Sequence, residues 1–396
     1  MTLSSHDANN RGLAALRAGD AATAAALFEQ ALAADEQAPG LWRNLAHARR
    51  LAGDDRGERA ALEAALNLDQ RDLAALVRLA QLHERRDERR EAMIRWSAVL
   101  QLGAQIADPT PDLIDLLDHG RRYCGVRQAD ISEQVRTKLD PEAAAMEETG
   151  RRRAGAFLDH VLGERRLYAN ICAGLHYPFL PADEFFDDRH FPWFAALGAK
   201  ASAIRAELDA LLADPGDALR PYVRMDKGTP RSQWDSLDHN LDWGACFLWE
   251  YGEPNPPVLD RCPETAAALA ALPGARIPGR APSAFFSILR PNTRIPPHTG
   301  VTNTRAIVHL PLVVPPGCGF RVGGETREWV EGRPFAFDDT IEHEAWNDSD
   351  AMRAVLIFDV WNPHLSDDEQ RVIAEYCRMI DQISGPDQPI AAPRRA

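Results

Sequence analysis

The first quarter of the chain repeats with a period of 34 residues, and this period constrains its fold more than any other feature. Apolar and small residues recur at equivalent positions, in the sets Phe28, Leu62 and Trp96; Ala31, Ala65 and Val99; and Leu32, Leu66 and Leu100. A Gly-Asp pair stands at the same place in the first two copies, at residues 19–20 and 53–54. One such unit cannot bury its apolar face alone, so we expect neighbouring copies to stack.

Three copies fit between residues 5 and 104, and a helical repeat of this length resembles the tetratricopeptide repeat. The resemblance implies a curved slab of paired helices whose concave side often binds peptides or partner proteins. Two interpretations stay open. The repeats form either a docking surface that delivers a peptide or protein substrate, or a rigid cap or dimerisation element.

The C-terminal half has a different pattern, in which short β-branched and aromatic runs are separated by Pro, Gly and Asn. The runs cover residues 284–290, 304–314, 333–340 and 352–360. This pattern is typical of strands and turns. It predicts a small antiparallel barrel or jelly roll, whose mouth can hold a cofactor.

Two histidines and an arginine stand among these runs, at His298, His343 and Arg353. Neutral imidazole is a ligand for iron, and a guanidinium in an apolar strand is costly without an anionic partner. Taken singly, each histidine could be a surface or hydrogen-bonded residue, and Arg353 could be a surface cation. Together they predict a site that holds Fe(II) and the far carboxylate of a 2-oxo acid.

The segments 298–305, 337–347 and 358–363 around these residues resemble the aspartyl/asparaginyl β-hydroxylase family. The similarity is good from about Phe285 to Pro363 and extends more weakly back to Tyr168. The resemblance implies a double-stranded β-helix of the jelly-roll, cupin-like kind. It also implies Fe(II), 2-oxoglutarate as cosubstrate and dioxygen, with hydroxylation of an Asp or Asn residue in a peptide or protein and release of succinate and CO2.

The same resemblance implies a role for each site residue. His298 and His343 are the metal ligands, while Ser287 and Arg353 bind the distal carboxylate of 2-oxoglutarate. His309 contacts the other end of the cosubstrate.

The sequence departs from related oxygenases at two positions. Gly300 stands where most non-heme iron oxygenases place a third, carboxylate ligand, a difference typical of this family. Ile307 stands where some members have an arginine next to the oxo-acid end, and Arg305, on the same strand face, is the candidate to replace it. We interpret Asp338 and Asp339 as turn residues rather than as a missing metal carboxylate.

Composition limits the class of protein. The chain of 396 residues has a formal charge of −14 and an isoelectric point near 5.4, which argues against binding of nucleic acid. It contains no apolar run long enough to cross a bilayer and no leader pattern, so we expect no membrane contact and a cytoplasmic location. The six cysteines lack a CxxC pair, which favours free thiols.

These observations predict an α+β protein. We expect repeats over residues 5–104, a helical linker region over 105–167, a dioxygenase domain over 168–384 and a disordered tail over 385–396. Within the linker region, Pro141 is expected to begin a helix that runs to residue 167.

Other functions stay open. The same chemistry could act on a free amino acid, a natural-product peptide or an acyl chain, because fold and metal do not determine the substrate. A non-catalytic binding protein with a degenerate barrel is the alternative from another class. Candidates for gripping an acidic substrate are Arg305, Arg321, Arg294 and Lys227.

Overall fold

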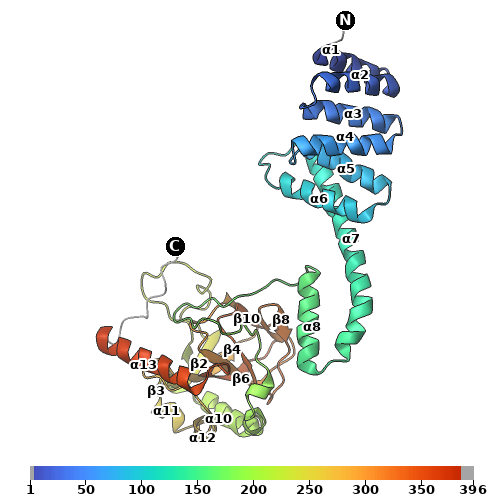
Figure 1. The fold of residues 1–396 in the computed structure, drawn as a ribbon. Coiled ribbons are helices and arrows are strands. Elements are labelled where there is room, and N and C mark those ends of the chain that lie inside the picture. Colours follow the sequence, from blue (N-terminus) through green and yellow to red (C-terminus); the bar gives the residue numbers. More distant parts are fainter. Residues whose placement is uncertain (1–3, 385–396) are drawn as a thin grey trace. The chain divides into compact units, whose positions relative to one another are not determined.

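The computed structural model describes residues 4–384, which form two compact units divided between Leu158 and Asp159 (Figure 1). The predicted tail over 385–396 lies outside the described residues. Among the residues described, no helix combines the length and the apolar composition that crossing a membrane requires. The six cysteines are free thiols, as expected.

The first unit begins as a stack of paired helices (Figure 1). The helices are α1 (Ser5–Arg17), α2 (Ala21–Ala34), α3 (Pro39–Leu51), α4 (Asp55–Leu68), α5 (Leu73–Arg85) and α6 (Arg89–Gly103). The prediction of stacked helical repeats is therefore confirmed.

The Gly-Asp pairs end one helix of a pair and begin the next. Gly19 and Gly53 have φ values of 80° and 72°, in the left-handed region that favours glycine at the end of a helix. The carboxylates of Asp20 and Asp54 then accept hydrogen bonds from the backbone N–H groups of Thr23 and Gly57, at 3.0 and 2.8 Å. These bonds cap α2 and α4 and fix the turn within each repeat.

The core of this unit follows the 34-residue period. The equivalent residues Phe28, Leu62 and Trp96 are each 0% exposed. Small residues allow close packing: a Cβ added at Gly12 would lie 2.6 Å from Phe28 Cε1. Stacking therefore buries the face that a single repeat would leave open.

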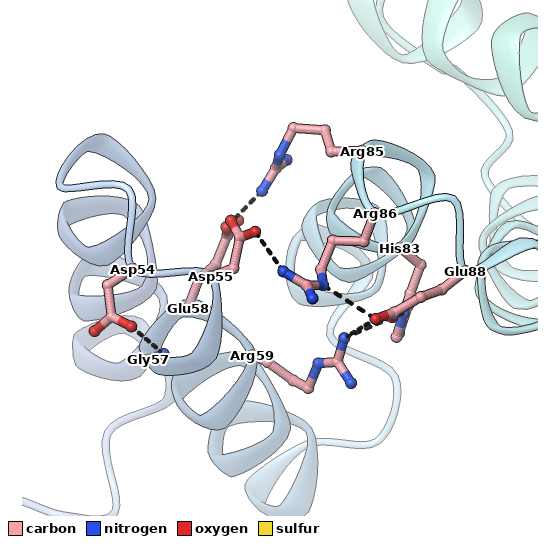
Figure 2. Close-up of polar contacts among 9 residues, drawn as sticks. All are labelled: Asp54, Asp55, Gly57, Glu58, Arg59, His83, Arg85, Arg86 and Glu88. Carbon is pink, nitrogen blue, oxygen red and sulfur yellow. Dashed lines mark hydrogen bonds and ion pairs between the residues drawn. The ribbon is translucent and has the colours of Figure 1, made fainter.

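Ion pairs join neighbouring repeats at the turn that precedes α6 (Figure 2). Glu88 accepts hydrogen bonds from Arg59 of α4 at 2.5 and 2.7 Å and from Arg86 at 3.1 Å. His83 Nδ1 lies 2.6 Å from the same carboxylate. Arg86 also contacts Asp55 at 2.9 Å, so this network links α4, α5 and α6.

A long helix, α7 (Pro111–Ala144), packs on α6 and covers the last repeat. A Cβ added at Gly120 would lie 2.7 Å from Trp96 Cε3, so the two helices approach closely. The expected helix start at Pro141 is wrong, because α7 continues through Pro141 and ends three residues later. Proline lacks the N–H that continues the helical hydrogen bonding, and α7 ends within one turn after it. The next helix is α8 (Glu148–Val161).

The second unit contains two antiparallel sheets. The four predicted runs coincide with strands of the larger sheet, whereas the strands of the smaller sheet lie outside those runs. Within the described residues, the larger sheet has the order β1-β2-β4-β11-β6-β9, with β3 also paired to β2. Its strands are β1 (Arg220–Pro221), β2 (Trp243–Glu250), β3 (Glu253–Pro254), β4 (Ala284–Leu289), β6 (Arg305–Val313), β9 (Phe335–Phe337) and β11 (Arg353–Trp361).

The smaller sheet has the order β5-β10-β7-β8 in the same part of the chain. Its strands are β5 (Thr293–His298), β7 (Cys318–Val322), β8 (Glu325–Arg327) and β10 (His343–Asn347). The α-helices of this unit are α9 (Phe194–Gly198), α10 (Ala201–Ala213), α11 (Pro256–Leu259), α12 (Pro263–Ala270) and α13 (Asp367–Ser384).

Successive side chains of β11 point to opposite faces of the larger sheet. Leu356 packs in a core with Ile204 and Leu208 of α10, while its neighbour Val355 packs in a second core with Phe320 of the smaller sheet. One face of the larger sheet is therefore covered by helix, and the other shares a core with the smaller sheet.

Candidate active site

The six residues predicted to bind the metal or the cosubstrate line a single cavity of about 470 Å³ in the second unit. They are Ser287 on β4, His298 on β5, Arg305 and His309 on β6, His343 on β10 and Arg353 on β11. The cavity therefore draws side chains from both sheets, and distant parts of the sequence meet there.

The two histidines lie opposite each other on paired strands, β5 and β10, with ring centroids 4.0 Å apart. Each ring is oriented by a backbone carbonyl. His298 Nδ1 lies 2.8 Å from the Pro296 oxygen, and His343 Nδ1 lies 3.0 Å from the Ile341 oxygen. A proton on each Nδ1 leaves both Nε2 atoms with a lone pair, the form in which imidazole binds a metal.

Burial keeps these imidazoles neutral. It lowers the pKa of His343 to about 3, with a smaller contribution from His298. Burial also lowers the pKa of His298. Within residues 4–384 there is no group of three or more His, Cys, Asp and Glu side chains that could hold a metal ion.

Gly300 faces the carboxylate of Asp339. A Cβ added at Gly300 would lie 2.0 Å from Asp339 Oδ2, so this carboxylate fills the space that a side chain at position 300 would need. Burial raises the pKa of Asp339 to about 7, and Asp338 adds to the effect. Asp338 is a turn residue, because its Oδ1 accepts from the Thr340 N–H at 3.0 Å. Asp339 lies in the turn itself, as interpreted, and its side chain also lines the cavity.

Arg353 is a buried cation without an anionic partner among the described residues. Its side chain is 1% exposed, and Nη1 reaches only the hydroxyl of Ser287, at 3.4 Å. The guanidinium lies over the ring of Trp329, 4.4 Å from the centroid. Burial lowers the pKa of Arg353 to about 9, which reflects the cost of an uncompensated charge. A carboxylate bound here would supply the missing partner.

Other polar atoms beside Arg353 also lack partners. Within the described residues, the buried side-chain atoms without a hydrogen bond are His309 Nδ1, Trp329 Nε1 and Arg353 Nε. The rings of His309 and Trp329 are 5.6 Å apart. Burial lowers the pKa of His309 well below its ordinary value, and Arg353 adds to the effect. Buried polar atoms are normally satisfied, so this cluster indicates a polar ligand.

Arg305 differs from Arg353, because its charge is already compensated. It forms an ion pair with Asp359 and donates to the Arg280 carbonyl at 3.0 Å. The Asp359 carboxylate comes from the adjacent strand β11 and is 3% exposed. Of the residues predicted to grip an acidic substrate, Arg294, Arg321 and Lys227 do not line the cavity.

An aromatic wall, which the sequence did not predict, forms another part of the cavity lining. Tyr222 stacks on Trp243 at 3.9 Å, and Phe247 stacks on Phe285 at 4.9 Å. Trp243 Nε1 also donates to Ser287 Oγ at 3.1 Å, which leaves the hydroxyl proton free for a ligand. Only the density of aromatic residues between 222 and 251 could have indicated this wall.

The fold and the cavity define a protein that joins helical repeats to a two-sheet unit with a histidine-lined site. Residues 199–363 match the sequence model of the aspartyl/asparaginyl beta-hydroxylases. The mouse aspartyl/asparaginyl beta-hydroxylase is 38% identical over 147 residues, which cover 37% of this chain and 20% of that protein. The ornithine lipid ester-linked acyl 2-hydroxylase of Rhizobium tropici is 31% identical over 214 residues, which cover 52% of this chain and 72% of that protein.

The chain therefore belongs to the aspartyl/asparaginyl β-hydroxylase family, a family of hydroxylases. It spans only about a fifth of the length of the mouse and human enzymes of that name, 20% and 19%. Among solved structures, the Sgt2 tetratricopeptide domain of Aspergillus fumigatus matches with a TM-score of 0.28 and 19% identity, over 32% of this chain and 81% of that one. A TM-score of 0.28 supports no conclusion about the fold of either unit.

Proposed function

We propose that this chain is an Fe(II)- and 2-oxoglutarate-dependent dioxygenase that hydroxylates an Asp- or Asn-type residue in a peptide or protein. Succinate and CO2 are the co-products. The observation that carries the proposal is the buried guanidinium of Arg353, which lacks an anion and lines the same cavity as two neutral histidines. Membership of a hydroxylase family supports it.

We further infer that the two sheets form the double-stranded β-helix that the sequence resembles. The shared core between β11 and the smaller sheet supports this arrangement, as does the origin of the site residues in both sheets. A cofactor site in the mouth of such a fold is a common arrangement.

The residues present fit Fe(II) and the cosubstrate. His298 and His343 would hold the metal through Nε2, because their Nδ1 atoms are engaged by backbone carbonyls. When bound, Fe(II) and 2-oxoglutarate supply the oxidising chemistry that uses dioxygen.

Arg353 and Ser287 would bind the C5 carboxylate of 2-oxoglutarate. Arg353 donates through N–H groups, and the Ser287 hydroxyl proton is free because Trp243 and Arg353 donate to its oxygen. His309 would contact the other end of the cosubstrate. Some family members have an arginine at the position of Ile307. Arg305 could replace that arginine only after breaking its ion pair with Asp359.

A second candidate is the same chemistry on an uncharged substrate such as an acyl chain. Two observations favour it: the aromatic wall and the compensated charge of Arg305. The R. tropici relative is named for acyl hydroxylation, whereas the mouse relative is named for Asp and Asn. A free amino acid or a natural-product peptide would also lie within this chemistry.

We also propose that the repeats dock a peptide or protein substrate. The alternatives are a rigid cap and a non-catalytic binding protein. The intact set of cavity residues argues for catalysis.

The test supplies Fe(II) and 2-oxoglutarate with pools of peptides, amino acids and acyl compounds, and measures succinate and a mass gain of one oxygen. We expect succinate release that is stimulated by one pool and matched by the mass gain. If 2-oxoglutarate binds but no pool gives succinate above the rate without enzyme, the catalytic proposal is wrong.

A further inference from the structure

A second cavity of about 460 Å³ lies in the same unit as the candidate active site, and none of the six residues predicted to bind the metal or the cosubstrate lines it. Its walls come mainly from β2 and the turn after it, from α12 with the loop that follows, and from β11. The two cavities share Phe358 and Asp359. The charge of Asp359 is compensated by Arg305, which lines the active-site cavity but not the second one. The second cavity is therefore a separate site beside the first.

The interior of this cavity is apolar. Trp249 and Phe358 contribute aromatic rings, and Ile277 and Val360 contribute branched aliphatic side chains. Ile277, Phe358 and Val360 are buried, so this lining belongs to the interior of the unit rather than to its outer surface. Cavities of this size can enclose most of a small ligand, and an apolar lining favours a ligand with an apolar body.

Two opposite charges stand at the rim of the cavity without pairing. Arg276 and Glu253 both line the cavity, and both are exposed. The chain segments that carry them are neighbours, because a Cβ added at Gly252 would lie 3.3 Å from the Ile277 oxygen. Within residues 4–384, neither side chain forms an ion pair, with the other or with a third residue. Each charge is thus open to a ligand.

We propose that the second cavity binds a free α-amino acid with an apolar side chain. The apolar side chain of the ligand packs against Trp249 and Phe358. Its carboxylate pairs with Arg276, and its ammonium group pairs with Glu253.

The two rim charges favour a zwitterion over a ligand with a single charge. A fatty acid would satisfy Arg276 but bring its carboxylate beside Glu253, and an apolar amine would satisfy Glu253 but stand beside Arg276. Like charges placed together weaken binding, so the rim selects against both of these classes. An α-amino acid carries both charges on one carbon atom and matches both rim residues. This argument does not depend on the proposed oxygenase activity.

The test titrates the full chain with L-phenylalanine and with L-leucine and follows binding by ligand-observed NMR, which also measures weak affinities. Each amino acid is compared with the amine that lacks its carboxylate and with the acid that lacks its ammonium group. L-alanine provides the zwitterion without a large apolar side chain. We expect one of the two amino acids to bind saturably with Kd below about 1 mM, and its amine, its acid and L-alanine to bind at least tenfold more weakly.

Single charge removals assign the two ends of the ligand. Arg276→Gln should weaken the amino acid about tenfold and leave the amine within about twofold, because the amine lacks the carboxylate that Arg276 binds. Glu253→Gln should weaken the amino acid similarly and leave the acid unchanged. The matched control Arg151→Gln removes the same charge from an exposed position of α8 and should leave all affinities within about twofold of the parent.

A cavity-filling variant locates the ligand. Gly274 lines the cavity, and a Cβ added there meets no atom within 4 Å. Gly274→Phe should therefore fill part of the cavity and weaken the amino acid at least tenfold. The matched control Gly155→Phe places the same ring on α8, where an added Cβ is equally free of contacts, and should bind like the parent. Melting curves by circular dichroism check that every variant is folded.

The proposal is wrong if neither amino acid binds, or if the amine or the acid binds as tightly as the amino acid. It is also wrong if Gly274→Phe and Gly155→Phe have equal affinities. The variant His298→Ala/His343→Ala should keep the parental affinity, whereas loss of amino-acid binding in this variant would place the ligand in the active-site cavity instead. Because this binding needs neither metal nor turnover, a failure of the oxygenase proposal is separated from a failure of this one.

Discussion

The two arginines that line the cavity differ in how their charge is compensated, and this difference assigns them different tasks. Arg305 is held by Asp359, so it contributes little free positive charge. Arg353 contacts the Ser287 hydroxyl and the face of Trp329, and no carboxylate pairs with it within the described part of the chain. The guanidinium of Arg353 is therefore the group that a carboxylate ligand would stabilise most.

Replacing Arg353 with Met tests this assignment. Met keeps an apolar contact with Trp329 but removes the charge, so we expect KM for 2-oxoglutarate to rise at least tenfold, since a lost buried charge pair costs about 2–5 kcal/mol. Fe(II) affinity should hardly change. Initial rates and a metal titration measure the two effects. Loss of metal with unchanged KM would assign Arg353 a structural role instead.

A side chain at position 300 would meet the Asp339 carboxylate, a contact that local sequence could not reveal. The carboxylate of Asp339 fills the space of a Cβ, so Gly300→Ala must displace it and should cost about 1–3 kcal/mol of stability. The double variant Gly300→Ala/Asp339→Ala should recover most of that loss. Thermal melts of the metal-free protein measure both. Equal melting temperatures for the parent and Gly300→Ala would show that the side chains do not compete.

At the scale of elements, the 34-residue period predicted which residues form the repeat core, because each copy packs in the same way. Phe28, Leu62 and Trp96 are all fully buried, as their spacing requires. The helix start predicted at Pro141 was wrong, because a proline near the end of a helix resembles one at its start in the local sequence. The aromatic wall was missed because stacks such as Tyr222 on Trp243 depend on strand register rather than on local pattern.

The network at Glu88 gives a prediction for the repeats. Hydrogen bonds from Arg59 and then His83 lower the pKa of Glu88 to about 2, from an ordinary value of 4.5. The folded state therefore holds this carboxylate ionised more strongly than the unfolded state does. The stability that the Glu88 carboxylate contributes to the folded repeats is fully present above pH 4.5 and is lost as pH falls from 4.5 towards 2.

Glu88→Gln should therefore lower the stability of the repeats by roughly 1 kcal/mol at pH 7. The difference from the parent should shrink as pH falls through this window. Urea unfolding at several pH values, followed by circular dichroism, measures it. A difference that stays constant down to pH 2 would assign the effect to packing rather than to charge.

At the scale of the whole molecule, the chain divides into two compact units, so the first unit can be removed by truncation. Such a truncation distinguishes a docking role of the repeats from a role as a rigid cap. The repeats are predicted to end near residue 104, and α7 packs on α6 within the same compact unit. A truncation that begins at residue 147 keeps α8 (Glu148–Val161) intact and removes the repeat stack with its covering helix.

We expect the truncated chain to fold and to convert 2-oxoglutarate slowly without a substrate. Activity on a long peptide or protein substrate should fall at least tenfold, because stacked repeats contribute binding surface rather than catalytic groups. Steady-state rates on a short and a long version of one substrate measure the effect. Undiminished activity on the long version would favour the cap over the docking role.

The central claim is that two histidines and one buried arginine make this cavity an Fe(II) and 2-oxoglutarate site. The most direct measurement is anaerobic Fe(II) titration of the parent and of His298→Ala/His343→Ala, followed by succinate formation on admission of oxygen. We expect a single Fe(II) per parental chain and succinate formation that depends on it, with both lost in the double variant. A double variant that still forms succinate at the parental rate would show that the two histidines do not hold the iron.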